Sequence, residues 1–135
     1  IAKACTKIQG QITSGANTIA QRATMAALDN PVSKIKFMVD EFKVRRDLIL
    51  KLLNAIPGIK INVPKGAFYV FPDIRPTGLS SKDFATKLLE AENVAAVPGD
   101  AFGTAGEGFL RCCYATSFDE LKIAMSRMER FLGSL

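Results

Sequence analysis

The chain has 135 residues, of which 48% are hydrophobic and 23% charged, and its formal net charge is +5. This length suits one domain with a substantial core and is too short for two, and the composition is ordinary for a soluble globular protein. No apolar run approaches the roughly 20 residues that a membrane helix needs, and no signal-peptide pattern opens the chain. The absence of histidine excludes His-based catalytic triads and most zinc sites.

The first sixteen residues mix apolar and small polar types and are typical of one element running into a loop. The chain opens at Ile1 in mid-pattern, and we expect it to be a fragment of a longer protein. Asn17 is a suitable N-cap for a helix over Thr18–Leu28. Pro31 begins the next helix, because a missing N–H is tolerated in the first turn. Apolar residues at three- and four-residue steps over Val32–Ile56 predict a helix of about seven turns.

The sequence also predicts about four strands. Alternation over Ile59–Val63 predicts a half-buried strand. The run Ala67–Phe71 is apolar on both faces and predicts a central strand, and Gly66 supplies the turn of a hairpin between these two. Val94–Val97 and Phe109–Ala115 are predicted as two further strands, joined by a glycine-rich loop.

Two capping boxes open the remaining helices. Ser80 with Asp83 begins a helix that reaches about Ala91, and Ser117 with Glu120 begins the last one. The last helix is predicted to turn inward Leu121, Ala124, Met128, Phe131 and Leu132. Helices that flank a small sheet make an α/β fold, here a two-layer sandwich.

Charge and cysteine usage limit the partners. The cations from Lys34 to Lys51 alternate with acidic residues, which indicates a solvated helix face and not a nucleic-acid interface. Cys112 and Cys113 point to opposite faces of a strand and, with Cys5, suit reduced, packed thiols. We therefore predict a cytoplasmic protein without metal, membrane or nucleic-acid partners.

Few residues have the surroundings that catalysis requires. The loop GDAFGTAGEG, residues 99–108, lacks the phosphate-loop spacing and leads into a strand, so we predict a tight or flexible connection. The eleven lysines lie on polar helix faces, at turns or near an end, whereas a catalytic lysine needs a desolvated setting. The adjacent cysteines have no histidine to activate them. No catalytic residue is predicted in this chain.

Arg111 is the exception among these residues, because it stands inside an apolar strand. A buried guanidinium needs an anionic partner or a route to water. One interpretation is an internal ion pair or a solvated strand face. The other is a fork that binds a ligand carboxylate with two parallel hydrogen bonds, a geometry that lysine cannot supply.

Five stretches follow one another along the chain: TSGANTIAQRATMAAL, the RRD of the long helix, PKGAFYVFPD, VAAVPGDAFG and FLRCCYATS. Together they resemble the C-terminal part of class I pyridoxal-phosphate-dependent aminotransferases, most closely the aspartate aminotransferases. The resemblance implies that residues 1–29 are the trailing segment of a large cofactor domain and the start of the interdomain helix. Residues 30–135 would then be the small α/β domain.

The resemblance also implies roles for three residues. The family's R-x-S-Y-A-type strand binds the substrate α-carboxylate through its arginine, which is Arg111 here, although Cys112 and Cys113 replace the usual Ile-Ser. Phe68 matches an aromatic residue that lines the substrate site, and core packing is its alternative. Ser14 matches a loop that approaches the neighbouring subunit's active site in the family's homodimers.

The function implied is transfer of an amino group from an amino acid to a 2-oxo acid, with aspartate, aromatic and prephenate-type substrates left open. The family's Schiff-base lysine and its other pyridoxal 5'-phosphate ligands would precede Ile1. We therefore expect this chain alone to lack cofactor and activity, and to self-associate through the face that a large domain would cover. The alternative is a free-standing ligand-binding or interaction module without catalysis.

Overall fold

The computed structural model describes residues 1–135, which divide into two compact units, Ile1–Phe37 and Met38–Leu135. The first unit contains α1 (Ala2–Ile12) and α2 (Thr18–Leu28), followed by the 3₁₀ turn η1 (Val32–Ile35). The predicted division into residues 1–29 and 30–135 refers to the domains of a longer protein and stays a prediction. None of the helices is both long and apolar enough to span a bilayer.

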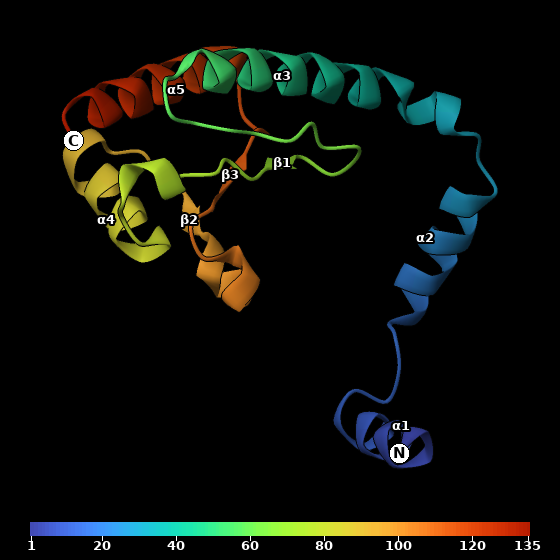
Figure 1. Cartoon of the computed structure of the whole chain (residues 1–135). Helices are drawn as coiled ribbons and strands as arrows, with labels where there is room; N and C mark the ends of the chain where they lie inside the picture. The colour runs from blue at the N-terminus through green and yellow to red at the C-terminus, as the bar shows by residue number, and fades with distance from the viewer. The chain divides into compact units, whose positions relative to one another are not determined.

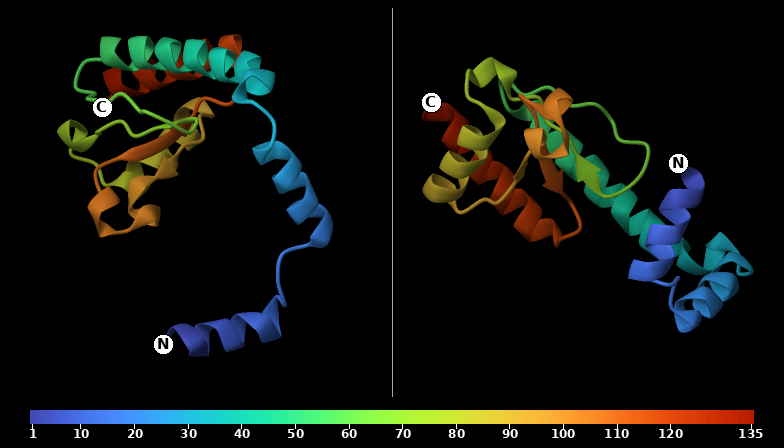
Figure 2. Two further views of the ribbon diagram at one scale, coloured as in Figure 1. Left: turned by 90° about the vertical axis from the view of Figure 1, so that its right-hand side faces the viewer. Right: turned by 90° about the horizontal axis from the view of Figure 1, so that it is seen from below.

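The second unit is a small antiparallel sheet with helices against one face, as Figures 1 and 2 show. Its helices are α3 (Lys36–Ala55), which begins at the end of the first unit, α4 (Ser81–Glu92) and α5 (Phe118–Gly133). The strand order is β1-β3-β2. The central strand β3 (Leu110–Cys113) pairs with β1 (Tyr69–Val70) on one side and β2 (Val97–Pro98) on the other. The predicted α/β class, helices on a small sheet, is confirmed.

The core lies between this sheet and the helices. Phe84 of α4 meets Phe131 of α5 edge to face, with ring centroids 5.2 Å apart. Tyr114 follows β3, is buried, and donates its hydroxyl to the carbonyl of Ala67 at 2.9 Å. Such a partner is what a buried phenol requires. The other large, fully buried side chains are Ile49, Leu53, Val70, Pro72, Ile74, Leu88, Leu110, Leu121 and Met128.

The helix starts that depend on local capping agree with the sequence. Asn17 Oδ1 accepts from the backbone N–H groups of Ile19 and Ala20, which caps α2. Ser80 Oγ accepts from the N–H of Asp83 and Ser117 Oγ from that of Glu120, which caps α4 and α5. The inward face of α5 is also confirmed: its predicted residues are buried or pack partly buried against the core, and Met125 joins them.

The predicted hairpin is wrong. Residues 59–63 form no strand, and only Lys60 makes an isolated bridge, to Asp73. The partner of β1 is β3, more than forty residues further along the chain, so the sheet has three strands instead of four. The positive φ of the connecting turn is at Ala67, not at Gly66. Periodicity identifies a segment that can pair, but it does not identify the partner.

The predicted seven-turn helix is shorter in the structure. Residues Val32–Ile35 form the separate 3₁₀ turn, and the α-helix runs only from Lys36 to Ala55. Residues 99–108 are not an open loop, because they contain two 3₁₀ turns, η3 (Gly99–Phe102) and η4 (Thr104–Gly106). A further 3₁₀ turn, η2 (Arg75–Thr77), precedes α4.

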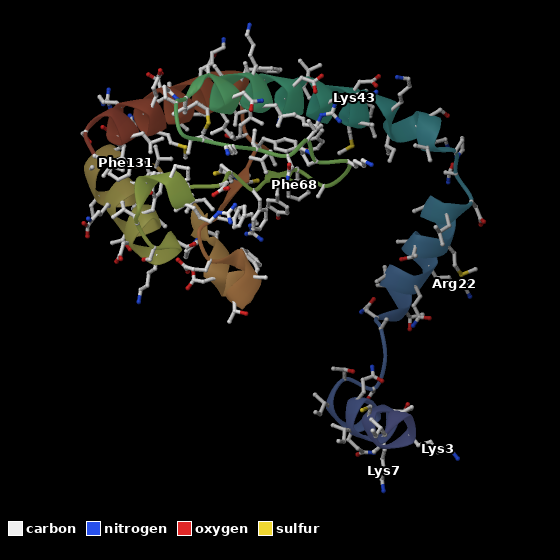
Figure 3. The ribbon with its side chains drawn as sticks, viewed as in Figure 1. Lys3, Lys7, Arg22, Lys43, Phe68 and Phe131 are labelled. Carbon is white, nitrogen blue, oxygen red and sulfur yellow. The ribbon has the colours of Figure 1, made fainter.

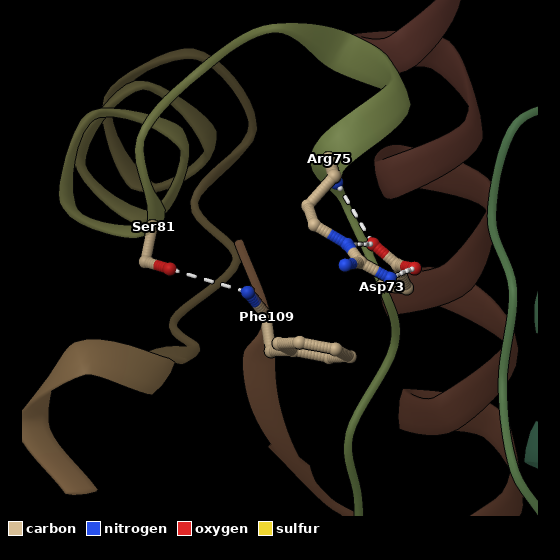
Figure 4. Close-up of polar contacts among 4 residues, drawn as sticks. All are labelled: Asp73, Arg75, Ser81 and Phe109. Atoms are coloured by element: carbon tan, nitrogen blue, oxygen red, sulfur yellow. Dashed lines mark hydrogen bonds and ion pairs between the residues drawn. The ribbon is translucent and has the colours of Figure 1, made fainter. Parts of the chain in front are cut away.

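Ser81 connects α4 to the start of β3 (Figure 4). Its side chain is fully buried, and its Oγ accepts from the N–H groups of Gly108 and Phe109 at 2.8 and 3.2 Å. The backbone N–H of Ser81 donates to Glu107 Oε1 at 2.9 Å. The residues that lead into the central strand are therefore attached to the first turn of α4 from both directions.

Asp73 and Arg75 form the other polar contact drawn in Figure 4, an ion pair between residues two apart in the chain. The buried carboxylate of Asp73 accepts from Arg75 Nε at 2.9 Å, from Nη2 at 2.6 Å and from the backbone N–H at 3.0 Å. The guanidinium of Arg75 also lies 5.2 Å from the ring of Phe109. The hydrogen bond from Arg75 holds the pKa of Asp73 below its ordinary value of 3.8, against the opposing effect of burial.

We expect the change Ser81→Ala to lower the free energy of unfolding by about 1–3 kcal/mol, because it leaves the buried N–H of Gly108 without an acceptor, whereas the N–H of Phe109 keeps the carbonyl of Gly106. Urea unfolding of the two proteins measures the difference. Thr86→Ala on the exposed side of α4 is the matched control and should change stability little. Equal losses in both variants would contradict this role of Ser81.

We expect Asp73→Asn to reduce the loss of stability that acid causes. The pKa of Asp73 is lowered in the folded state, so its contribution is fully present above 3.8 and disappears as the pH falls through the folded value. The test compares unfolding midpoints at neutral pH and at about pH 3: the variant should be less stable at neutral pH, and the difference should shrink in acid. Asp119→Asn, at an exposed side chain, should show neither effect. A difference that stays constant with pH would contradict the assignment.

Candidate functional site

Arg111 lies on the face of β3 opposite to the helices. Along this strand Leu110 and Cys112 are buried against the core, whereas Arg111 is partly buried and Cys113 exposed. The alternation is the two-residue period of a strand. It explains how a cation stands in an apolar run without entering the core.

Two aromatic rings contact the guanidinium of Arg111. Its Cζ lies 4.4 Å from the ring centroid of Tyr69 and 4.6 Å from that of Phe102, both within cation–π range. No carboxylate of the chain lies within 4.0 Å of this guanidinium, and its N–H groups donate to no protein acceptor. The internal ion pair, one part of the first interpretation of this residue, is therefore not formed, and the solvated strand face and the carboxylate-binding fork both stay open.

The glycine-rich loop places Phe102 over Arg111. Its two 3₁₀ turns pack backbone to backbone, so closely that a Cβ on Gly99 would lie 2.1 Å from the carbonyl oxygen of Gly106. A Cβ on Gly106 would lie 2.0 Å from the carbonyl oxygen of Gly99. Only glycine permits this approach at either position. The connection is thus a tight one, and these two glycines serve backbone packing.

Phe68, the predicted substrate-site residue, contacts Tyr69, which in turn contacts Arg111. The ring of Phe68 stacks on Phe42 of α3, with centroids 5.8 Å apart, and meets the ring of Tyr69 at 4.6 Å. The rings in cation–π contact with Arg111 are those of Tyr69 and Phe102, not that of Phe68. Phe68 is 38% exposed, so core contact does not enclose it, and its role at the substrate stays a prediction.

Ser14 lies at the end of α1 in the first unit. It is exposed, has a φ of 56°, and donates its hydroxyl to the carbonyl of Gly10 at 3.2 Å. Its predicted approach to a neighbouring subunit stays a prediction.

Sequence reasoning missed Tyr69 and Phe102. The sequence contains a signal for Tyr69, because it follows Phe68 in the same short motif. Strand alternation places the two side chains on opposite faces of β1. Selecting Tyr69 instead of Phe68 requires knowing that β1 pairs with β3 in the register Tyr69↔Cys113. Phe102 has no comparable signal, because a loop residue reaches the guanidinium only through the folding of η3.

A shallow groove of about 440 Å³ lies beside β1; Tyr69, Phe71 and Phe109 contribute to its wall, whereas Arg111 and Phe102 do not line it. The groove is mostly apolar, and segments 62–64 and 105–106 complete it. A small molecule therefore has room beside the Tyr69 ring.

The residues present do not fit a complete pyridoxal phosphate site. Every lysine of the chain is exposed, and Figure 3 shows Lys3, Lys7 and Lys43 pointing away from the ribbon. A Schiff-base lysine requires desolvated surroundings that lower its pKa. The glycine-rich loop offers no phosphate cradle at Gly99 and Gly106, because each is closed by the other's backbone.

Comparisons with known proteins identify similar chains. A model of the family described as aminotransferase class I and II matches residues 1–128. The aspartate aminotransferase of Pyrococcus horikoshii is 42% identical over 134 residues, covering 98% of this chain and 34% of that protein. The crystal structure of an aromatic aminotransferase from Pyrococcus horikoshii OT3 matches with a TM-score of 0.84 and 44% identity, over 95% of this chain and 34% of that one.

A structure of the aspartate aminotransferase from Thermus thermophilus with maleate matches with a TM-score of 0.80 and 39% identity, over 96% of this chain and 34% of that one. The chain thus spans about a third of the length of the relatives that it matches.

The two adjacent cysteines should differ in reactivity. Burial raises the pKa of Cys112 to about 12, with a smaller contribution from Cys113, so Cys112 is almost entirely protonated at neutral pH. We expect iodoacetamide to alkylate the exposed Cys5 and Cys113 and to leave Cys112 unmodified in the folded chain. Tandem mass spectrometry of the digested protein distinguishes the two positions. Denatured protein is the control, in which all three should react; equal rates for Cys112 and Cys113 in folded protein would contradict the expectation.

Proposed function

The chain belongs to the aminotransferase class I and II family, and from this membership we propose that it is the part of an amino-acid:2-oxo-acid aminotransferase that binds the substrate α-carboxylate through Arg111. One observation carries the proposal: a partly buried guanidinium whose N–H donors have no acceptor in the protein. A cation left in this state is suited to an anionic ligand, and arginine geometry matches a carboxylate with two parallel hydrogen bonds.

The proposed reaction class agrees with what the relatives share. Their names specify aspartate and aromatic amino acids, and the Thermus thermophilus structure contains maleate, a dicarboxylate. Aspartate and aromatic amino acids differ in their side chains but carry the same α-carboxylate, as do the corresponding 2-oxo acids. An arginine that binds this group therefore serves an aspartate, aromatic or prephenate-type enzyme equally. The alternative of a free-standing binding module has no comparable support.

The cofactor of the proposed enzyme is pyridoxal 5'-phosphate, which supplies the electron sink for the transfer of the amino group. Since all lysines of this chain are exposed, we propose that the Schiff-base lysine and the phosphate ligands belong to the remaining part of the full-length protein. The 135 residues alone are then expected to be inactive.

We propose a cytoplasmic homodimer in which Ser14 approaches the partner's active site and Phe68 lines the substrate site. In this chain alone, several large apolar side chains are exposed, among them Ile12, Ile19, Leu28, Val32 and Phe37. Apolar surface of this extent favours association, which supports the proposal that the isolated chain self-associates.

Arg111→Lys in the full-length protein tests the proposed function. Lysine keeps the charge but loses the second hydrogen bond, so kcat/KM for the amino acid and the 2-oxo acid should fall by roughly 10- to 100-fold. Steady-state kinetics with both substrates measure the change. Arg130→Lys is the control, because Arg130 pairs with Glu92 at the end of α4 and contributes nothing to this face. An unchanged kcat/KM in Arg111→Lys would remove Arg111 from the site.

A further inference from the structure

We propose that Tyr69 and Phe102 are positioning residues, which hold the guanidinium of Arg111 at the angle that receives the substrate carboxylate; the inference rests on the proposed function of Arg111. The two rings come from separate parts of the fold, β1 and η3. Each approaches Cζ of Arg111 to within 5 Å. These two ring contacts hold the guanidinium of Arg111, which forms no ion pair.

The type of partner matters for the carboxylate. An acidic side chain beside Arg111 would occupy the N–H donors in the plane of the guanidinium and would compete with the substrate. An aromatic ring attracts the cation through its π face and accepts none of these in-plane hydrogen bonds. Tyr69 and Phe102 therefore restrict the long side chain and leave the donors free.

Both rings are themselves supported. The backbone of Tyr69 is fixed by the pairing of β1 with β3 opposite Cys113, and its ring meets the ring of Phe68 at 4.6 Å. Phe102 meets the ring of Phe71 edge to face at 5.7 Å.

The close backbone contact between Gly99 and Gly106 fixes the loop segment that carries Phe102. An arginine side chain has four rotatable bonds and loses conformational entropy when it is ordered. A guanidinium already held by supported rings loses less of that entropy when the substrate binds, so the substrate binds more tightly.

The experiment measures steady-state kinetics of the cofactor-loaded, full-length protein with the changes Tyr69→Leu and Phe102→Leu, singly and together. Each single change should raise KM for the amino acid by about threefold to tenfold and the pair by more, with kcat little changed. Tyr69→Phe and Phe102→Tyr keep an aromatic ring and should restore KM to nearly the wild-type value. Leu89→Ala, at an exposed position of α4, is the unrelated control.

A structural role predicts a different result. Variants that merely unfold in part would lower kcat through the active fraction and leave KM unchanged. An amine substrate without a carboxylate provides the second readout, because its slow reaction should be the same in wild type and in the leucine variants. If a leucine variant does not fold, the methionine variant at the same position is measured in its place, since methionine fills a similar volume.

The outcomes separate the two proposals. If Arg111→Lys raises KM and the leucine or methionine variants do not, the positioning role is overturned and the role of Arg111 stands. If Arg111→Lys leaves KM and kcat unchanged, the proposed function fails, whatever the aromatic variants show. Equal effects of the leucine variants on the amine and on the amino acid would also overturn the positioning role.

Discussion

The strand β3 carries a permanent cation in an apolar run, and no acidic side chain of the chain neutralises it. An unpaired guanidinium in the core would cost several kcal/mol, and a carboxylate partner would consume its hydrogen-bond donors. The alternation of β3 places Arg111 on the side away from the helices, and two aromatic rings replace the missing acid. β1 carries one of these rings, and the turn η3 carries the other.

The glycine-rich loop carries the second of these rings, that of Phe102. Gly99 and Gly106 touch through their backbones, which folds residues 99–106 into a short double turn and brings Phe102 back over the sheet. Ser81 of α4 fixes the end of the loop, because its Oγ accepts hydrogen bonds from the N–H groups of Gly108 and Phe109. A segment that is rich in glycine is therefore rigid here, since its glycines allow close packing instead of free rotation.

The features that the sequence predicts well are local ones. Asn17, Ser80 and Ser117 act on N–H groups two or three residues away, so the start of each helix is readable from a few letters. Strand pairing is not local: β1 joins β3 across more than forty residues, and nothing within residues 59–71 distinguishes that partner from the hairpin. The same limit applies to the site. Arg111 stands out by its sequence context alone, whereas Phe102 becomes its neighbour only after two turns of backbone have folded.

The arrangement also indicates how tasks are divided within the proposed enzyme. Under the proposed function this chain presents a cation for the substrate carboxylate but no desolvated lysine, so chemistry at the amino group would come from residues outside these 135. Every amino-acid substrate carries the α-carboxylate, so a site specialised for that group places no restriction on the side chain. Relatives that are 39–44% identical over nearly the whole of this segment bear the names of aspartate and aromatic aminotransferases. That spread is expected if selection between side chains is made elsewhere in the protein, while this segment holds the end of the substrate that all of them share.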